Sequence, residues 1–213
     1  FRRPGGPGGL APTPAWAAYG PQEGSWLGGA VAWAGDVNGD GYDDLAAGAP
    51  GDALRVPYGT VYVYYGAAGG PGLHPGAVMT VAQPGSGFGT ALAGARDMDG
   101  DGYDDLLAGA YRLAYAVAPQ NAEGAALLYF GSRTGIGSAP GWVRWGDKAN
   151  ATYGFAVGSA GLPDSTGAPA ITVGAPYYKL DDKTPLGRAF VHFGPLEPRY
   201  YLWLPLLKHQ GAP

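Results

Sequence analysis

The sequence repeats itself three times, and this repetition limits the possible folds more than any other feature does. Each copy contains a segment that ends in "GAP" or "GAY", with its glycine at Gly48, Gly109 or Gly174, so the copies recur about every 63 residues. Each copy also has a later run rich in β-branched or aromatic residues, which is "GTVYVYYG" from Gly59 in the first copy. Tandem units of this length are typical of repeat architectures, in which each unit folds as one small element.

Each copy predicts four short strands separated by turns. Glycine and proline account for 40 and 20 of the 213 residues, a proportion that would suggest disorder if apolar, alternating runs did not interrupt it. We therefore expect an all-β chain, with small-residue strands such as "AVAWAG" packed closely together at a hub. The predicted strands lie near Trp16–Tyr19, Ala30–Ala34, Asp44–Gly48 and Thr60–Tyr65, then Val78–Gln83, Thr90–Ala95, Asp105–Gly109 and Ala125–Phe130, then Trp142–Trp145, Phe155–Ser159, Ala170–Gly174 and Ala189–Phe193.

Nine of the 17 acidic residues lie in two segments that are near-copies of each other, "DVNGDGYDD" from Asp36 and "DMDGDGYDD" from Asp97. Both segments place side-chain oxygens at positions 1, 3, 5 and 9 and a glycine at position 6. Oxygens with this spacing converge on one point when the chain curls, the glycine permits the turn, and the residue at position 7 offers its carbonyl. Hard oxygen ligands on a loop favour Ca²⁺, so we predict two Ca²⁺ sites.

Two other interpretations of these segments are less favourable. An EF-hand needs a glutamate at position 12 and flanking helices, whereas Ala47 and Ala108 stand there and a strand-like run follows. Asp, Asn and Gly are also ordinary turn residues, but turn chemistry alone does not explain why one ligand pattern occurs twice. Three carboxylates gathered without a cation would repel one another. The third copy has Leu162, Asp164, Thr166 and Ala170 at the ligand positions, and we predict no metal there.

These motifs resemble the FG-GAP repeats of the integrin α-subunit β-propeller and related proteins. The pair that gives the repeat its name is "LG…GAP" from Leu27, "FG…GAY" from Phe88 and "YG…GAP" from Tyr153, with the acidic loop between the two halves in the first two copies. The resemblance covers roughly residues 16–194 and implies four-stranded blades around an axis, each loop holding a structural Ca²⁺. Carried over by position, the implied ligands are Asp36, Asn38, Asp40, the Tyr42 carbonyl and Asp44, then Asp97, Asp99, Asp101, the Tyr103 carbonyl and Asp105.

Three blades are fewer than the four to eight of known propellers, so the chain is incomplete as a single ring. Unpaired edges and open flanks favour association. The chain is then a fragment of a longer protein, or two copies close a six-bladed ring, or copies stack into an open filament. We expect a Pro/Gly-rich arm at 1–14, blades at about 15–70, 76–135 and 141–197, and a C-terminal strand or tail at 198–213. The apolar run Tyr200–Leu207 either adds as a strand to a neighbouring copy or covers the last blade of its own chain.

Composition argues against several classes of function. The formal net charge of −4 argues against a nucleic-acid partner, and the absence of cysteine excludes disulfides and thiolate metal sites. No apolar run is long enough to predict membrane insertion as a helix. The three histidines are scattered and the clustered carboxylates are assigned to the loops, so we predict that the chain is not an enzyme and has no catalytic residues.

The sequence therefore predicts an extracellular or cell-surface, calcium-stabilised structural or adhesive protein that self-associates as a homo-oligomer or filament. The alternative is a lectin-like or adhesin-like module, part of a longer propeller, that binds a glycan or a protein through surface aromatics. The tryptophans available for such a role are Trp16, Trp26, Trp33, Trp142, Trp145 and Trp203.

Overall fold

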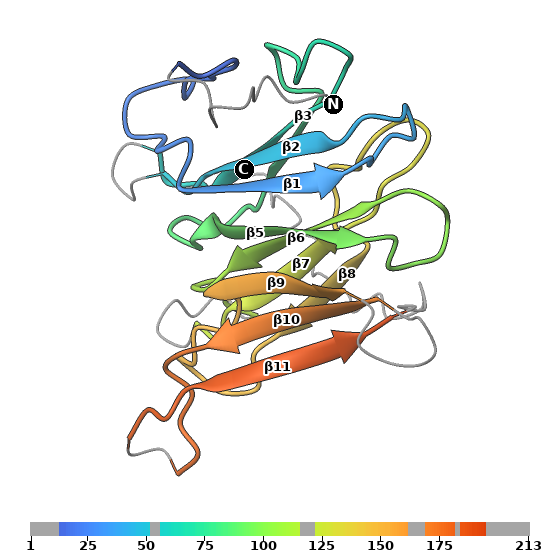
Figure 1. Cartoon of the computed structure of the whole chain (residues 1–213). Coiled ribbons are helices and arrows are strands. Elements are labelled where there is room, and N and C mark those ends of the chain that lie inside the picture. Colours follow the sequence, from blue (N-terminus) through green and yellow to red (C-terminus); the bar gives the residue numbers. More distant parts are fainter. Residues whose placement is uncertain (1–12, 52–55, 116–121, 162–168, 182–183, 195–213) are drawn as a thin grey trace, which may run out of the picture.

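The computed structural model describes residues 13–51, 56–115, 122–161, 169–181 and 184–194, and its regular structure is entirely β (Figure 1). None of these residues belongs to a helix long and apolar enough to cross a membrane. The strands are β1 (Ala30–Gly35), β2 (Asp44–Ala49), β3 (Thr60–Tyr64), β4 (Ala77–Thr80), β5 (Phe88–Arg96), β6 (Asp105–Ala110), β7 (Ala125–Tyr129), β8 (Trp142–Trp145), β9 (Ala156–Gly161), β10 (Ala170–Ala175) and β11 (Arg188–Phe193).

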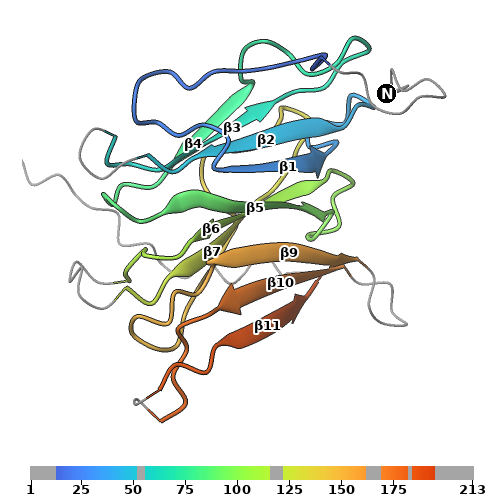
Figure 2. The same cartoon turned by 60° about the vertical axis from the view of Figure 1, so that its left-hand side comes forward.

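The strands form three antiparallel sheets in which neighbours in the chain are also neighbours in space. The orders are β1-β2-β3-β4, β5-β6-β7-β8 and, in the described part of the last repeat, β9-β10-β11. The sheets stack face to face, and their first strands β1, β5 and β9 lie side by side (Figures 1 and 2). The three sheets do not close a ring. The predicted fold class, an all-β stack of three blades that is incomplete as a ring, is confirmed.

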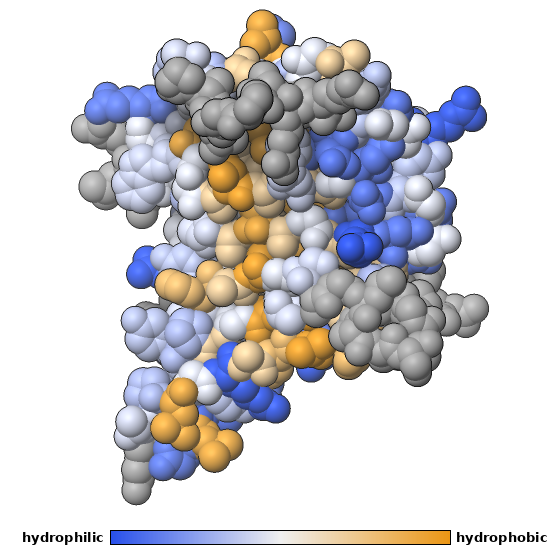
Figure 3. Space-filling model, viewed as in Figure 1, coloured by the Kyte–Doolittle hydropathy of each residue, from blue (hydrophilic) through white to orange (hydrophobic). Residues whose placement is uncertain are grey.

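Two apolar cores hold the stack together, one on each side of the middle sheet. Leu106 and Ala108 of β6 face the core shared with the first sheet, and Leu107 faces the core shared with the third. All residues of β6 and β7 are consequently buried. Hydrophobic residues form a band across the three sheets, whereas hydrophilic residues gather where the acidic loops lie (Figure 3).

The two end sheets each bury one face against the middle sheet and leave part of the other face open, because on the first sheet Trp16 covers Tyr64 of β3. On β1, Ala34 is buried against the middle sheet while Val31 and Trp33 are exposed. On β11, Phe190 packs inward while Val191 and Phe193 are exposed. Large apolar side chains on an open sheet face are unusual for a monomer and are typical of an interaction surface.

Glycines allow the sheets to approach each other at backbone distance. A Cβ at Gly48 of β2 would collide with the carbonyl oxygen of Gly89 in the second sheet. A Cβ at Gly109 of β6 would collide in the same way with the carbonyl oxygen of Gly154, which precedes β9. The "GAP" and "FG" glycines of successive repeats are therefore contact partners across the sheets.

The grouping of strands differs from the prediction by one strand per repeat. Val78–Gln83 was expected to open the second unit, yet β4 pairs with β3 in the first sheet, and Trp142–Trp145 likewise pairs with β7. A repeat period fixes the spacing of units but not the point at which one unit begins, because Gly/Pro-rich turns occur on both sides of this strand. The predicted strand Trp16–Tyr19 is wrong, since Trp16 instead packs edge-on against Tyr64 and donates a hydrogen bond to the Gly72 carbonyl.

Several predictions fall on residues outside the described ranges. They are the arm up to residue 12, the loop of the third repeat that includes Asp164, the C-terminal segment with Tyr200–Leu207, and Trp203. These, and the domain boundaries, stay predictions.

The backbone contact between the second and third sheets gives a direct test of the stack. We expect Gly109→Ala to lower the free energy of unfolding by about 1–3 kcal/mol, because its methyl group forces the Gly154 backbone away. Gly137→Ala is the matched control, since a Cβ there would lie 3.8 Å from its nearest neighbour, a backbone oxygen. Urea unfolding measures both, and equal stability of the two variants would contradict close packing at Gly109.

Candidate metal centre

The two acidic loops occupy equivalent places in the first two sheets. The first connects β1 to β2 and the second connects β5 to β6, and they lie on the same side of the stack (Figure 1). Gly100 and Gly102 in the second loop have φ angles of 84° and 94°, and the corresponding glycines of the first loop have 73° and 88°. Residues with side chains rarely adopt such angles, which is why glycine stands at these positions in both copies.

The aspartate at position 1 organises each loop by accepting hydrogen bonds from the backbone. Asp97 accepts from the amides of Gly100, Asp101 and Gly102 at 2.6, 3.0 and 2.8 Å. Asp36 accepts from the corresponding amides of the first loop at 2.7, 3.0 and 2.8 Å. The repeated sequence therefore produces a repeated local structure, with one carboxylate at the centre of each turn.

The aspartate at position 9 ties each loop to the body of its sheet. Asp105 is fully buried at the start of β6, and its two oxygens accept from the amides of Met98 at 2.7 Å and Gly131 at 2.9 Å. Burial raises the pKa of Asp105 to about 7, although both hydrogen bonds lower it. Asp44 of the first loop has the same two kinds of partner, and burial raises its pKa to about 6.

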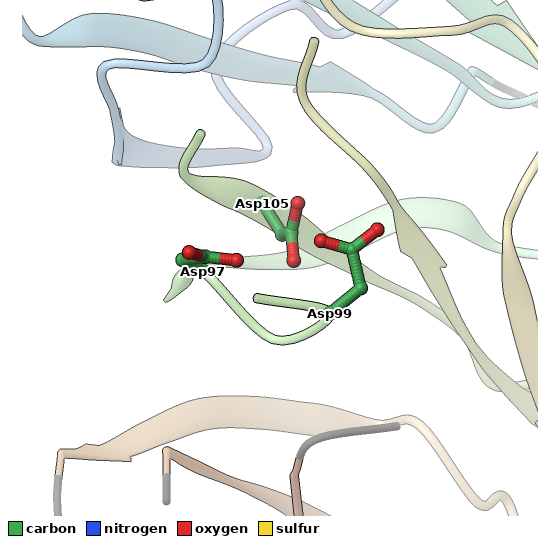
Figure 4. Close-up of side chains that lie close together, drawn as sticks. All are labelled: Asp97, Asp99 and Asp105. Atoms are coloured by element: carbon green, nitrogen blue, oxygen red, sulfur yellow. The ribbon is translucent and has the colours of Figure 1, made fainter. Parts of the chain in front are cut away.

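Asp97, Asp99 and Asp105 converge on one point (Figure 4). One carboxylate oxygen from each lies within 4.8 Å of the other two. Burial raises the pKa of Asp99, and the charges of Asp101 and Asp97 raise it further. A group of three carboxylates, one of them buried, is unfavourable when all are ionised without a cation, and its hard oxygens match what Ca²⁺ prefers. The triad therefore fits a Ca²⁺ loop.

The remaining predicted ligands are arranged differently. Asp101 is exposed, and one of its oxygens accepts a hydrogen bond from the Tyr103 amide at 3.0 Å. In the first loop the amide of Asn38 stands where the second loop has Asp99, and its nitrogen donates to Asp40 at 2.9 Å. Among the described residues, three carboxylates come together only in the second loop. A metal in the first loop, and the full set of ten ligands, stay predictions.

A residue that the sequence analysis did not assign connects the two loops. Asp104, at position 8 of the second loop, accepts a hydrogen bond from the Asp36 amide at 3.0 Å, and its own amide donates to the Asp36 carbonyl at 3.1 Å. The Ser132 amide donates to the Val37 carbonyl at 3.0 Å. The first loop is thus bound to the second sheet by three hydrogen bonds. The repetition of this acid at Asp43 and Asp104 was the available signal in the sequence.

Stacked antiparallel blades with an acidic loop in each of the first two define a β-propeller-type repeat module. Comparison with known proteins shows which repeat family these blades resemble. The model of the FG-GAP repeat matches residues 27–64 and 88–127. These two stretches therefore match the FG-GAP repeat and are similar to integrin α-subunits, and the resemblance stated from the sequence is confirmed.

The relatives with curated descriptions are much longer than this chain. Integrin alpha-PS2 of Drosophila melanogaster is 46% identical over 83 residues, which is 36% of this chain and 6% of that protein. Integrin alpha-IIb of Mus musculus is 41% identical over 112 residues, 52% of this chain and 11% of that protein. Integrin alpha-6 of Gallus gallus is 31% identical over 144 residues, 66% of this chain and 12% of that protein.

The buried carboxylates predict opposite pH dependence with and without calcium. In the metal-free protein the raised pKa values of Asp44 and Asp105 keep them protonated at pH values where the unfolded chain, with an ordinary pKa of 3.8, is already ionised. The unfolded state then binds fewer protons, so this contribution to stability falls as pH rises from about 4 to about 7. With calcium bound, acid protonates the ligands and releases the ion, so stability falls as pH decreases.

Thermal unfolding at about pH 5 and about pH 7.5, with calcium or with a chelator, measures both slopes. We expect the melting temperature to rise with pH in calcium and to fall with pH in chelator. The same slope in both conditions would contradict a cation at these carboxylates.

The link between the loops gives a second test. Gly35 has a φ angle of 82°, and a Cβ there would collide with the Asp104 carboxylate. Gly85, at 67°, has nothing within 4 Å of such a Cβ, so Gly85→Ala carries only the backbone strain. We expect Gly35→Ala to unfold more easily than Gly85→Ala by about 1.5–3 kcal/mol, the value of a hydrogen bond to a charged group. Chemical denaturation in chelator measures the difference, and its absence would show that Asp104 does not hold the first loop.

Proposed function

We propose that this chain is a calcium-stabilised structural or adhesive module of an extracellular or cell-surface protein. The triad of Asp97, Asp99 and Asp105 is the observation that carries the calcium role. The extracellular location is supported by the similarity to integrin α-subunits, which are cell-surface proteins. FG-GAP repeats and integrin α-subunits are a non-catalytic family, which supports a structural or binding role over the part of the chain that matches.

Calcium is proposed to act on stability and not on chemistry. The ion would be held by the second loop through the triad, and the similar hydrogen bonding of the first loop supports a second site there. Because Asp105 joins its loop to Gly131 and Asp104 joins the second loop to the first, an ion that orders the loop also orders the contact between two sheets. Ligands that bind only the folded state stabilise it by mass action.

We also propose that the module self-associates with a second copy of the chain. The supporting observation is the pair of open apolar faces, with Val31 and Trp33 on the first sheet and Val191 and Phe193 on the third. These residues lie on the outer sides of sheets whose inner sides are already packed on a neighbouring blade of the same kind.

A second candidate function is the binding of a glycan or a protein by surface aromatics. A hollow of about 460 Å³ beside the second sheet is lined by Tyr115, Glu123, Arg144, Trp145 and Asp147, among others. The rings of Tyr115 and Trp145 meet edge to face with centroids 5.4 Å apart. An aromatic surface with charged groups around it is a common way to bind sugars or polar peptides. Glycan-array binding that Trp145→Ala abolishes would favour this function.

Calcium titration tests the first proposal. We expect calorimetry to show two ions per chain, and Asp99→Ala to remove one of them. Calcium at about 100 times its dissociation constant should stabilise the chain by about 2.7 kcal/mol per site. The control is Asp147→Asn, an acid outside both loops that is about half exposed beside Arg188. Absence of binding and of any shift in melting temperature would rule out the calcium role.

A further inference from the structure

The first loop binds to the second sheet in a slot that has a recognisable set of walls. The ring of Tyr103 lies where a Cβ of Gly39 would be, and Asp104 and Ser132 form the hydrogen bonds to Asp36 and Val37 described above. The walls that meet the first loop are Tyr103, Asp104, Gly131 and Ser132. Beside them, Gly135 and Ile136 receive Tyr65, which follows β3, and the Ile136 amide donates to the Tyr65 hydroxyl at 3.2 Å.

The first sheet carries the same slot at its outer side. A hollow of about 320 Å³ is lined by residues at the equivalent repeat positions, together with Trp33 of β1. Those residues are Tyr42, Asp43, Gly66, Ala67, Gly70 and Pro71. The equivalent positions are half-buried or buried in the second sheet, whereas Tyr42 and Asp43 are exposed. Among the described residues, none fills this hollow as the first loop fills the slot on the second sheet.

The third sheet ends the stack with one glycine of the contact between sheets left without its partner. Gly174 of β10 is equivalent to Gly48 and Gly109, which touch the carbonyl oxygen of a glycine in the next sheet. A Cβ at Gly174 would meet only Ala156 of its own sheet, at 3.5 Å. At the other end of the stack, Gly28 is equivalent to Gly89, and a Cβ at Gly28 would have nothing within 4 Å.

We propose that a second copy of this chain stacks its third sheet on the exposed β1 part of the outer face of the first sheet, in the register of the contact seen twice within the chain. Trp16, which packs on Tyr64, covers the β3 part of that face and stays in place. Gly174 of one copy then meets Gly28 of the other, and the exposed Val191 and Phe193 cover Val31 and Trp33. The inference rests on the proposed self-association and adds the two faces that carry it.

The contact is heterologous, because two different surfaces meet. Each copy therefore keeps a free face unless the two copies join at both ends. Two copies joined in this way bring six blades together, which lies within the range of closed propellers. Continuity with the internal interfaces, and not the exposed area alone, identifies the partner as another copy of the same chain.

Mass in solution, measured by sedimentation in calcium, tests the inference. We expect the wild type to have twice the mass of one chain. Gly174→Ala should raise the dissociation constant about ten- to a hundredfold, because its methyl group overpacks the contact between the two copies. Trp33→Ala removes an exposed side chain at the other end and should weaken association too. Gly137→Ala, on an exposed turn of the middle sheet, should leave the mass unchanged.

The possible outcomes distinguish the proposed pair of faces from self-association in general and from calcium binding. A dimer that Gly174→Ala and Trp33→Ala leave intact would overturn these faces while keeping self-association. Larger assemblies that grow with concentration, and that both variants dissolve, would support the same contact in an open stack. A wild-type monomer at every concentration would overturn both self-association and the inference, and calcium binding by that monomer would leave the calcium role standing.

Discussion

Backbone contact between sheets is the constraint on which this structure depends. Gly48 and Gly109 each lie against the carbonyl of a glycine in the next sheet, so no side chain separates the strands at the centre of the stack. The small-residue strands β1, β5 and β9 lie side by side for the same reason. Larger apolar residues then fill the space further out, where they form two cores on the faces of the middle sheet. The abundance of glycine reflects this close packing as well as the number of turns.

The acidic loops add a second connection between the first two sheets. A buried carboxylate such as Asp105 is costly when ionised, yet it is also the group that holds its loop to the neighbouring turn at Gly131. A cation bound at this triad would resolve the conflict, because it would offset the charge and leave the hydrogen bonds in place. The first loop in turn sits on Asp104 and Ser132, so order in the second loop supports order in the first. We regard the two acidic loops as one connection between the first two blades, and call this connection, made by the bonds of Asp36 and Val37 to Asp104 and Ser132, the clasp.

The repeat period and the ligand spacing made most of this architecture predictable. Central strands such as β2, β6 and β10 and the loops before β2 and β6 follow from patterns that are local in sequence. The membership of β4 and β8 did not follow, because a repeated sequence does not show where a blade begins. The roles of Asp104 and Ser132 were also missed, since their partners lie in another repeat and only the stacking of sheets brings them together. Trp16 was misjudged because aromatic content alone does not distinguish a strand from a segment that covers one.

Hydrogen exchange at two amides tests most directly whether the loops act as a calcium-dependent clasp. The Asp36 amide donates to Asp104 and the Ser132 amide donates to Val37, and both bonds cross between the first and second sheets. With calcium we expect both amides to exchange slowly and together, as members of one cooperative unit, and with chelator we expect both to exchange faster. Exchange rates that do not change with calcium, or that are already those of an open loop, would contradict the clasp.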